Sequence, residues 1–227
     1  MKQNYILVLE HTPVFTIGMR NRENYAKEAK SSYFTGLGAD YVETNRGGLI
    51  TFHGPGQLVV YPILDLKNFV PNTTLFHGKK GNIIGMRWYI DTLEQTVIDL
   101  LKDKYSLEAY RSPHTGVWIG NEEKDNERKI CAMGVHNSQL VTGHGLALNC
   151  NTDLSWFDHI VPCGIEGKGV TSITKELNLD GRNENVTVES VIPLYLESFQ
   201  RHFQCDINEI DSSDYIQSIT NSSESID

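Results

Sequence analysis

Apolar side chains recur at helical spacing in two long stretches of the chain. Over Arg87–Lys104 they return every three or four positions, which predicts an amphipathic helix. Val188–Phe203 shows the same pattern and predicts a second helix. Because Pro193 lies within this stretch and has no backbone N–H to donate, we expect the second helix to start late or to kink.

Shorter apolar runs bounded by glycine, asparagine or charged residues predict β-strands. These runs are Tyr5–Leu9, Pro13–Ile17, Tyr41–Thr44, Leu58–Leu66, Gly116–Ile119, Lys129–Val135, Gln139–Thr142 and Leu146–Asn149. Two polar stretches, Asn21–Gly38 and Phe69–Asn82, are expected to be irregular. The order of strands, helix, strands and helix favours an α+β fold with a mixed or antiparallel sheet.

The composition is that of an ordinary globular protein. The chain has 227 residues, of which 39% are hydrophobic and 22% are charged, so a core of adequate size can form. The net charge is −9, but residues 206–227 hold six acidic and no basic residues, so much of this charge lies in the tail. We expect one domain over residues 1–208, followed by an acidic, serine-rich and disordered tail over residues 209–227.

Several classes of protein do not fit this sequence. It has no basic run typical of nucleic-acid binding and no apolar stretch of the ~18 residues that a membrane span needs. The start of the chain resembles neither a signal peptide nor a transit peptide. Its four cysteines have no CxxC spacing, which argues against a zinc ribbon or a disulfide scaffold and favours a reducing compartment.

Cys163 is the first residue that could carry chemistry. It stands between Pro162 and Gly164, at a break in an apolar run. Proline fixes its own φ and glycine allows a sharp turn, so the thiol could lie at the lip of a cleft and act as a nucleophile. The alternative is that Cys163 is a small buried hydrophobic residue.

A glycine-rich segment follows the third predicted strand. Arg46 to Gln57 contains four glycines, which allow the backbone to approach a ligand closely. Arg46 and His53 could reach a polar group of that ligand, whereas the alternative is a hairpin that only turns the chain. The segment has neither the GxxxxGK[ST] nor the GxGxxG pattern of nucleotide-binding loops.

Lys129 opens an apolar β run and could be partly desolvated there. Such a lysine can favour a nearby thiolate or act as a base, whereas the alternative is an ordinary surface lysine at a strand end. Strict alternation would place Cys131 on the same strand face as Lys129, although its setting favours a packed core thiol. Farther along, Gly143 and Gly145 around His144 suggest a tight turn with an exposed imidazole, or a plain hairpin turn.

Five stretches, in their order along the chain, resemble the lipoyl(octanoyl) transferase family. They are RGGLITFHGPGQLVVYPILDLK, TGVWIG, RKICAMGVH, HGLALN and DLSWFDHIVPCGIEGKGVTSITKEL. The resemblance extends over roughly Ile6 to Phe203, and HGLALNCNTDLSWFDHIVPCG is similar to the animal mitochondrial branch in particular.

The resemblance implies an α/β fold of the α+β type, with a mixed sheet and flanking helices like the catalytic domains of biotin protein ligases and lipoate ligases. It implies an acyltransferase that moves an octanoyl group from octanoyl-acyl carrier protein to a lysine of a lipoyl domain, the first step of endogenous protein lipoylation. The family's acyl-thioester nucleophile falls on Cys163 and its cysteine-activating lysine falls on Lys129. Its substrate-binding segments fall on Arg46, Gly47, Gly48, Leu49, Ile50, Thr51, Phe52, His53, Ala132, Met133, Gly134, Gly145, Leu146 and Ala147.

The resemblance also implies partners and a location. The acceptors would be lipoyl-domain proteins such as the glycine cleavage H protein and the acyltransferase subunits of 2-oxoacid dehydrogenases, and the location would be mitochondrial. Neither a metal nor ATP nor another cofactor is implied, because transfer from thioester to amide is downhill, and neither nucleic acid nor a membrane is an expected partner. Since the protein partners are typically acidic, we expect a basic or neutral docking face. Its candidate residues are Arg20, Arg22, Arg46, Lys79 and Lys80.

Two features of the chain differ from the family pattern. Members usually carry a strand and a long helix before the segment that begins here at Ile6, and we expect this chain to lack them. The Asn121–Arg128 loop is longer than in compact bacterial members. Two alternatives stay open, an ATP-dependent lipoate or biotin ligase and a non-catalytic module that binds acyl carrier or lipoyl domains. The combination of Cys163 with Lys129 favours the transferase.

Overall fold

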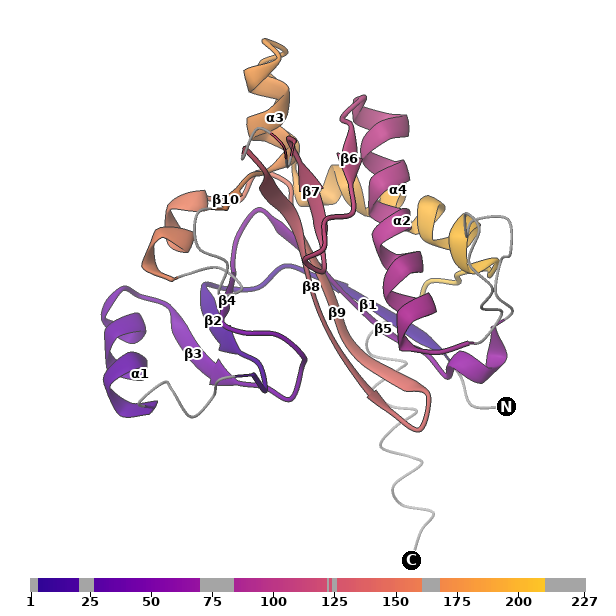
Figure 1. Cartoon of the computed structure of the whole chain (residues 1–227), viewed down its shortest axis with the longest axis horizontal. Helices are drawn as coiled ribbons and strands as arrows, with labels where there is room; N and C mark the ends of the chain where they lie inside the picture. The colour runs from indigo at the N-terminus through magenta and orange to yellow at the C-terminus, as the bar shows by residue number, and fades with distance from the viewer. Residues whose placement is uncertain are drawn as a thin grey trace, which may run out of the picture.

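The structure is a computed structural model that describes residues 4–20, 27–69, 84–121, 123, 126–160 and 168–210, with the backbone alone for residues 27–30 (Figure 1). Six residues named individually above therefore lie outside the described part of the chain. They are Arg22, Lys79, Lys80, Pro162, Cys163 and Gly164, and the stretch Phe69–Asn82 also lies outside it except for Phe69. Most of the tail predicted to be disordered, residues 211–227, lies outside it as well.

A large mixed sheet forms the centre of the molecule. Its strands lie in the order β1-β5-β9-β8-β7-β6, with each pair of neighbours antiparallel, and β10 pairs with β8 in parallel. The bounds are β1 Tyr5–Leu9, β5 Gln57–Ile63, β6 Ala109–Tyr110, β7 Val117–Ile119, β8 Arg128–Ser138, β9 Val141–Asn149 and β10 Gly169–Val170. The expected mixed sheet with flanking helices is confirmed.

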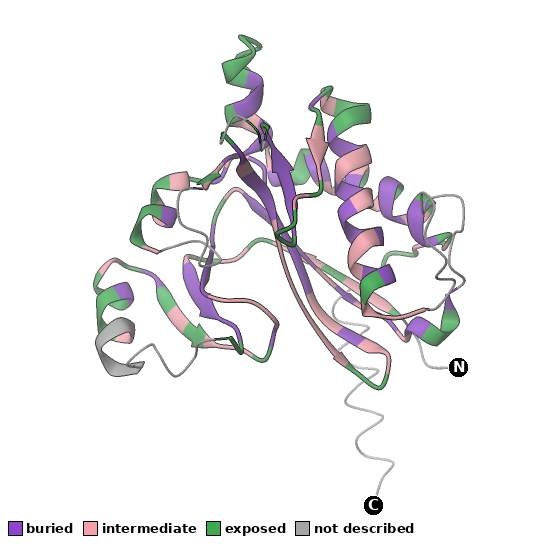
Figure 2. Ribbon diagram, viewed as in Figure 1, coloured by how far each residue is buried: buried purple, intermediate pink, exposed green. Residues whose placement is uncertain are grey.

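Two long helices bury one face of this sheet. Helix α2 spans Met86–Tyr105 and α4 spans Val188–Phe203, and both contribute to the main hydrophobic core together with side chains of β5, β8 and β9. The central strands are buried, whereas the tip of the β8–β9 hairpin is exposed (Figure 2). Two shorter helices, η2 Leu66–Asn68 and α3 Ile173–Leu179, lie at the ends of the sheet strands.

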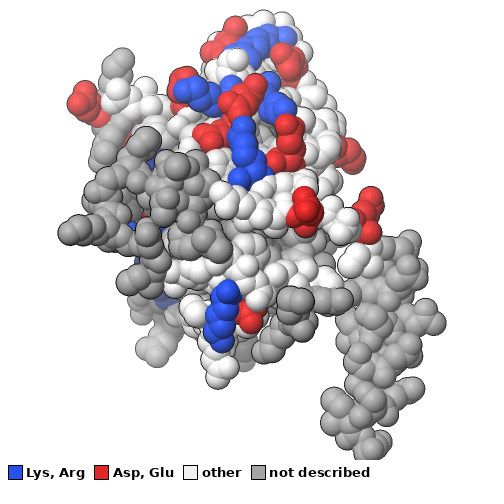
Figure 3. Space-filling view, turned by 90° about the vertical axis from the view of Figure 1, so that its right-hand side faces the viewer, with Lys and Arg blue, Asp and Glu red and all other residues white. Residues whose placement is uncertain are grey.

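The outer sides of α2 and α4 carry charges of both signs. Lys104 pairs with Glu197 at 2.9 Å and Arg201 pairs with Asp103 at 3.0 Å, so both ion pairs join the two helices. Figure 3 views this side of the molecule and shows acidic and basic side chains interleaved over its upper part. Because these pairs are solvent-exposed, each is worth only about 0–1 kcal/mol of stability.

A smaller sheet packs beside the large one and has its own core. Its strands are β3 Asp40–Glu43, β2 Val14–Ile17 and β4 Thr51–His53, in that order, and helix α1 Lys27–Gly36 lies next to β3. Phe15 stacks on Phe34 of α1 at 4.0 Å between ring centroids, and Phe52 stacks on Trp156 at 5.0 Å. Trp156 belongs to the 3-10 helix η4, Leu154–His159, so this core also holds the segment that leads to Cys163.

Several predictions of secondary structure were wrong, and each has a local cause. Helix α1 lies within the stretch expected to be irregular, because Phe34 reaches the aromatic core of the small sheet. The strands predicted on either side of His144 are one strand, β9, and the turn lies at Gln139 and Leu140. Both of these residues have positive φ (52° and 68°), as a type I′ hairpin turn requires.

Helix α4 also differs from its expected form. It begins at Val188 and continues through Pro193, so the predicted late start is wrong. Its first turn is capped by Thr187, whose side chain accepts a hydrogen bond from the N–H of Ser190. The cap and the buried apolar face outweigh the single backbone hydrogen bond that proline removes.

Candidate active site

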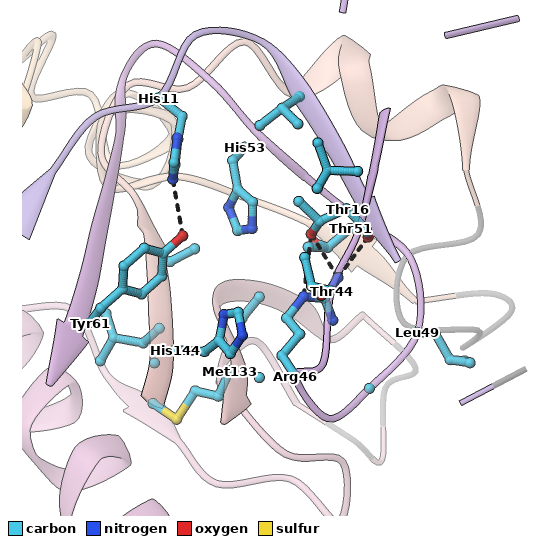
Figure 4. Close-up of a pocket in the computed structure, with 18 of the residues that line it drawn as sticks. His11, Thr16, Thr44, Arg46, Leu49, Thr51, His53, Tyr61, Met133 and His144 are labelled. Carbon is cyan, nitrogen blue, oxygen red and sulfur yellow. Dashed lines mark hydrogen bonds between the residues drawn. The ribbon is translucent and has the colours of Figure 1, made fainter. Parts of the chain in front are cut away.

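A pocket of about 330 Å³ opens between the two sheets (Figure 4). This volume is within the usual range for small-molecule sites. Its walls come from β2, β3 and β4 on one side and from β5, β8 and β9 on the other. The lining residues are His11, Thr12, Val14, Thr16, Asp40, Val42, Thr44, Arg46, Gly48, Leu49, Thr51, His53, Tyr61, Ala132, Met133, Gly134, His144, Gly145, Leu146 and Ala147.

Small residues on β8 and β9 form the floor of the pocket. Gly134 lies opposite Gly145 and Ala132 lies opposite Ala147 in the strand register, so each pair presents little side chain. A Cβ atom on Gly145 would stand 2.1 Å from the carbonyl oxygen of Val60, and one on Gly134 would stand 2.9 Å from Cδ of Arg46. A side chain at either position would therefore collide with β5 or with Arg46, so the strands can pack in this way only with glycine there.

Arg46 is a buried structural anchor of the pocket wall. Its Nη2 donates to the backbone oxygen of Thr16 at 2.7 Å and to the hydroxyl of Thr16 at 2.8 Å, and its Nη1 donates to the oxygen of Gly47 at 3.0 Å. The residue is only 7% exposed. Arg46 thus ties the glycine-rich segment to β2, and its proposed place on an exposed docking face is wrong. Arg20, in contrast, is exposed.

Three histidines converge on the pocket. His53 and His11 have ring centroids 5.7 Å apart, His11 Nε2 lies 3.0 Å from the hydroxyl of Tyr61, and His144 Nε2 lies 2.7 Å from Oδ1 of Asn45. Burial lowers the pKa of all three, most strongly for His53, whose pKa falls to about 4. The positive charge of Arg46 lowers the pKa of His53 and His144 further. His53 is therefore neutral at neutral pH.

Lys129 is buried at the start of β8. It is 7% exposed, and its Nζ lies 4.7 Å from the centre of the Trp118 ring, within the range of a cation–π interaction. The indole is itself fixed, because its N–H donates to the oxygen of His114 at 2.9 Å. Trp118 faces Lys129 in the β7–β8 register. The alternative of an ordinary surface lysine is wrong.

A bulge separates Lys129 from Cys131. The register pairs Trp118 with Lys129 but Val117 with Cys131, so two steps on β8 match one step on β7. Adjacent residues of β7 point to opposite faces, and therefore Lys129 and Cys131 do as well, contrary to the expected shared face. Cys131 is fully buried in the main core, where desolvation raises the pKa of its thiol, and burial raises the pKa of Cys150 to about 12. These two thiols are poor nucleophiles.

Comparison with known proteins identifies the family. Residues 1–200 match the family described as lipoyl protein ligase A/B catalytic domain. The chain belongs to this family. Among its relatives is the mitochondrial octanoyl-[acyl-carrier-protein]:protein N-octanoyltransferase of Danio rerio, 49% identical over 90% of this chain and 79% of that protein. The octanoyltransferase of Christiangramia forsetii is 43% identical over 90% of this chain and 80% of that protein.

A solved structure supports the fold. The lipoate-protein ligase A bound with ATP superposes with a TM-score of 0.65 over 95% of this chain and 79% of that chain, at 16% sequence identity. The predicted lipoate-ligase-like fold is thus confirmed, as is the resemblance to the octanoyltransferases.

The binding residues assigned from the family resemblance divide into two groups. Most of the predicted binding residues line the pocket, including His53, Gly134 and Gly145. Ile50 and Phe52 are instead buried in the small core, and Gly47 donates its N–H to the oxygen of Val135. Their contacts are with the protein, and their predicted roles in substrate binding are not tested by this geometry.

Cys163 lies outside the described residues, but the chain on its C-terminal side returns to Lys129. Val170 of β10 lies opposite Lys129 in the register, and the N–H of Thr171 donates to the oxygen of Lys129 at 3.0 Å. Lys168 pairs with the buried carboxylate of Glu127 at 2.8 Å. The pairing thus fixes one end of the Cys163 segment beside the strand that carries Lys129.

Sequence reasoning missed several residues of the site. His11 and Tyr61 line the pocket, although the sequence had not indicated either as a candidate site residue. His11 lies in the loop between β1 and β2, where polar neighbours hide any signal, whereas Tyr61 is a polar-tipped residue inside the otherwise apolar run of β5. Among the described residues, no group of three or more His, Cys, Asp and Glu side chains is placed to hold a metal ion. Nor does any helix of that part of the chain combine the length and hydrophobicity of a membrane span.

Proposed function

We propose that this protein is an octanoyltransferase that moves an octanoyl group from octanoyl-acyl carrier protein to a lysine of a lipoyl domain. The observation that carries the proposal is the high identity to relatives named octanoyltransferases, from animals and from bacteria, over about nine-tenths of this chain. The buried Lys129 and the pocket between the sheets support it, because both belong to segments that carry the family resemblance.

The pocket suits an eight-carbon chain. Val14, Val42, Leu49, Ala132 and Ala147 supply apolar surface, and the glycines of the floor leave room for the chain. Burial of eight carbons at about 0.8 kcal/mol each would supply up to roughly 6 kcal/mol of binding free energy. This apolar contribution distinguishes an octanoyl group from short acyl groups.

Transfer would occur in two steps through Cys163. In the first step the Cys163 thiolate attacks the carbonyl carbon of the octanoyl thioester, and the carrier thiol leaves with a proton. In the second step the acceptor amine attacks the Cys163 thioester, loses a proton, and forms the amide as the Cys163 thiol is released. Lys129 can favour the thiolate as a nearby cation and can accept the amine's proton once it is neutral. We assign both roles by resemblance, with the burial of Lys129 as support.

The acceptor proteins and the location are finer parts of this proposal. Lipoyl-domain proteins such as the glycine cleavage H protein and the acyltransferase subunits of 2-oxoacid dehydrogenases are the acceptors that we expect. We propose a mitochondrial location because the relatives in Danio rerio and Homo sapiens are named as mitochondrial. Imaging of the full-length protein with an organelle marker tests the location.

The mass of the intact protein tests the chemistry. After incubation with octanoyl-acyl carrier protein and without ATP, we expect an octanoyl adduct that hydroxylamine removes, as it removes thioesters. The adduct should be absent from Cys163→Ser and should form much more slowly in Lys129→Met. Cys131→Ser is the matched control, because it changes a thiol that is buried in the core. A folded wild-type protein without an adduct, or transfer that depends on ATP, would refute the proposal.

A further inference from the structure

A chain of buried hydrogen bonds runs from the pocket to the strand that carries Lys129. His53 Nδ1 lies 2.7 Å from Oε1 of Gln57, and Nε2 of Gln57 donates to Oδ1 of Asn149 at 2.8 Å. Nδ2 of Asn149 donates to the oxygen of Thr171 at 2.9 Å, and the N–H of Thr171 donates to the oxygen of Lys129. All four residues before Lys129 are buried, with exposures of at most 7%: His53, Gln57, Asn149 and Thr171.

Two backbone carbonyls fix the direction of every hydrogen bond in this chain. Because the oxygen of Thr171 can only accept, Asn149 must present its NH₂ group there and its Oδ1 to Gln57. The NH₂ group of Gln57 therefore faces Asn149, and it also donates to the oxygen of Phe52 at 3.3 Å. The remaining atom, Oε1 of Gln57, can only accept, so Nδ1 of His53 carries a proton.

The tautomer of His53 decides what its other nitrogen can do. Since burial keeps the imidazole neutral, a proton on Nδ1 leaves Nε2 with a lone pair. Among the described residues, Nε2 of His53 has no hydrogen-bond partner, and the ring lines the pocket (Figure 4). The pocket therefore presents a hydrogen-bond acceptor to whatever enters it.

The acyl group of an octanoyl thioester cannot satisfy this acceptor. Its acyl group offers only a carbonyl oxygen, which accepts hydrogen bonds, and a hydrocarbon chain. The amine that receives the acyl group has N–H bonds to donate, and it arrives only in the second step of the proposed reaction.

We propose that Gln57 and Asn149 are positioning residues that hold His53 with its proton on Nδ1, so that Nε2 accepts a hydrogen bond from the attacking amine of the acceptor lysine. This inference rests on the proposed transferase function. Two neutral amides suit the task, because a carboxylate in place of Gln57 would favour the charged imidazolium and remove the lone pair. The chain of hydrogen bonds continues from Asn149 through Thr171 to the backbone oxygen of Lys129, so His53 and Lys129 are fixed in one framework.

The tautomer can be measured directly. Nitrogen NMR of protein labelled with ¹⁵N-histidine distinguishes protonated Nδ1 from protonated Nε2, and the signals missing from His53→Gln assign the ring. At neutral pH we expect wild-type His53 to carry its proton on Nδ1. We expect Gln57→Met, which keeps the side-chain length but cannot accept this hydrogen bond, to populate the other tautomer. A proton on Nε2 in the wild-type protein overturns the inference without recourse to any variant.

The two half-reactions test the role. We expect Gln57→Met to slow the transfer of octanoyl from preloaded enzyme to a lipoyl domain by about tenfold, the effect of one hydrogen bond, while loading by octanoyl-acyl carrier protein changes less than about twofold. Equal losses in both half-reactions would overturn the assignment to the amine, and unchanged transfer with an altered tautomer would overturn the positioning role. Failure of the wild type to load would instead refute the proposed function and leave the tautomer result intact.

Ser198→Ala is the matched control for loss of a buried hydrogen bond. The hydroxyl of Ser198 donates to the oxygen of Thr96 at 2.8 Å, between α4 and α2 and away from the pocket. This variant should lose stability to a similar degree as Gln57→Met. Ser198→Ala should keep the His53 tautomer and the rates of both half-reactions of the wild type. A fall in its transfer rate would show that lost stability alone explains the result for Gln57→Met, and this would overturn the inference.

Discussion

The floor of the pocket leads to a quantitative prediction about Gly145. Replacement by alanine adds a Cβ that would stand 2.1 Å from the oxygen of Val60 and 2.8 Å from Cδ of Pro62, whereas ordinary contacts begin at 3.4 Å. The oxygen belongs to the backbone of β5, so β5 and β9 must separate by more than an ångström at the centre of the sheet. Overpacking of this kind destabilises a core by about 1–3 kcal/mol.

Gly143 offers a matched control two residues away on the same strand. A Cβ on Gly143 would meet no atom within 4 Å, and neither glycine has a positive φ. Alanine there should be neutral or should stabilise by up to about 1 kcal/mol, because it restricts the unfolded chain. The measurement is urea denaturation of both variants, supported by melting temperature, where we expect Gly145→Ala to melt about 2–12 °C below the wild type.

The octanoyl adduct gives a second readout of the same pair of variants. We expect Gly145→Ala to load slowly because the floor is deformed, and Gly143→Ala to load at the rate of the wild type. Equal stability of the two variants would refute the reasoning, because it would mean that β5 and β9 can separate at no energetic cost.

Three further predictions concern buried polar groups. Hydrogen bonds from Lys168 and Tyr110 lower the pKa of Glu127 below 4.5, so Glu127→Gln should destabilise the protein by about 1 kcal/mol at pH 7. Because the pKa of Glu127 is lower in the folded protein, the stability difference between wild type and variant should shrink as the pH falls below 4.5 and vanish below the folded pKa. Urea denaturation at each pH measures this difference. A difference that stayed constant with pH would contradict the assignment. The pKa of His53 falls from 6.5 to about 4 on folding, so wild-type stability should drop by up to about 3 kcal/mol as the pH falls from 6.5 to 4. His53→Gln should flatten this dependence of stability on pH. An unchanged dependence in the variant would contradict its assignment to His53. Trp118→Leu should slow loading of Cys163 several-fold more than Trp118→Phe, because the ring attracts the Lys129 ammonium by about 0.5–2 kcal/mol, and equal rates in the two variants would argue against this contact.

The sequence correctly predicted those elements whose own spacing of apolar residues matches their buried face. Helix α2 differs from the predicted helix by one residue at each end, because its apolar spacing and its buried face agree. Strand β1 has the predicted bounds. Helix α1 escaped prediction because its polar sequence is held in place by Phe34, which packs on Phe15 from a distant part of the chain.

The sequence identified most of the residues that line the pocket, but it did not predict how they are arranged. The expected shared face of Lys129 and Cys131 failed because a bulge breaks the period of two, and no residue type marks a bulge at this position. His144 has φ of 55° within a continuous strand, so a conformation typical of turns occurs where no turn exists. Arg46 was expected to face a partner, but it donates hydrogen bonds to Thr16 and Gly47. Thr16 is distant in the sequence and lies beside Arg46 only through the position of β2, so the sequence gives no sign of this contact.

The position of the pocket has a consequence for local unfolding. It separates two hydrophobic clusters with no residue in common, one under the large sheet and a smaller one around Phe15 and Phe52. The small sheet can therefore open in part while the large sheet stays folded. An acyl chain bound in the pocket would touch both sheets, because residues of both line it, and would stabilise their closed arrangement by an amount that grows with ligand concentration. Amide hydrogen exchange in β2 and β4 should thus slow on octanoyl loading, while exchange in α2 and α4 should stay the same. The acyl group itself would then join the two sheets into one cooperative unit.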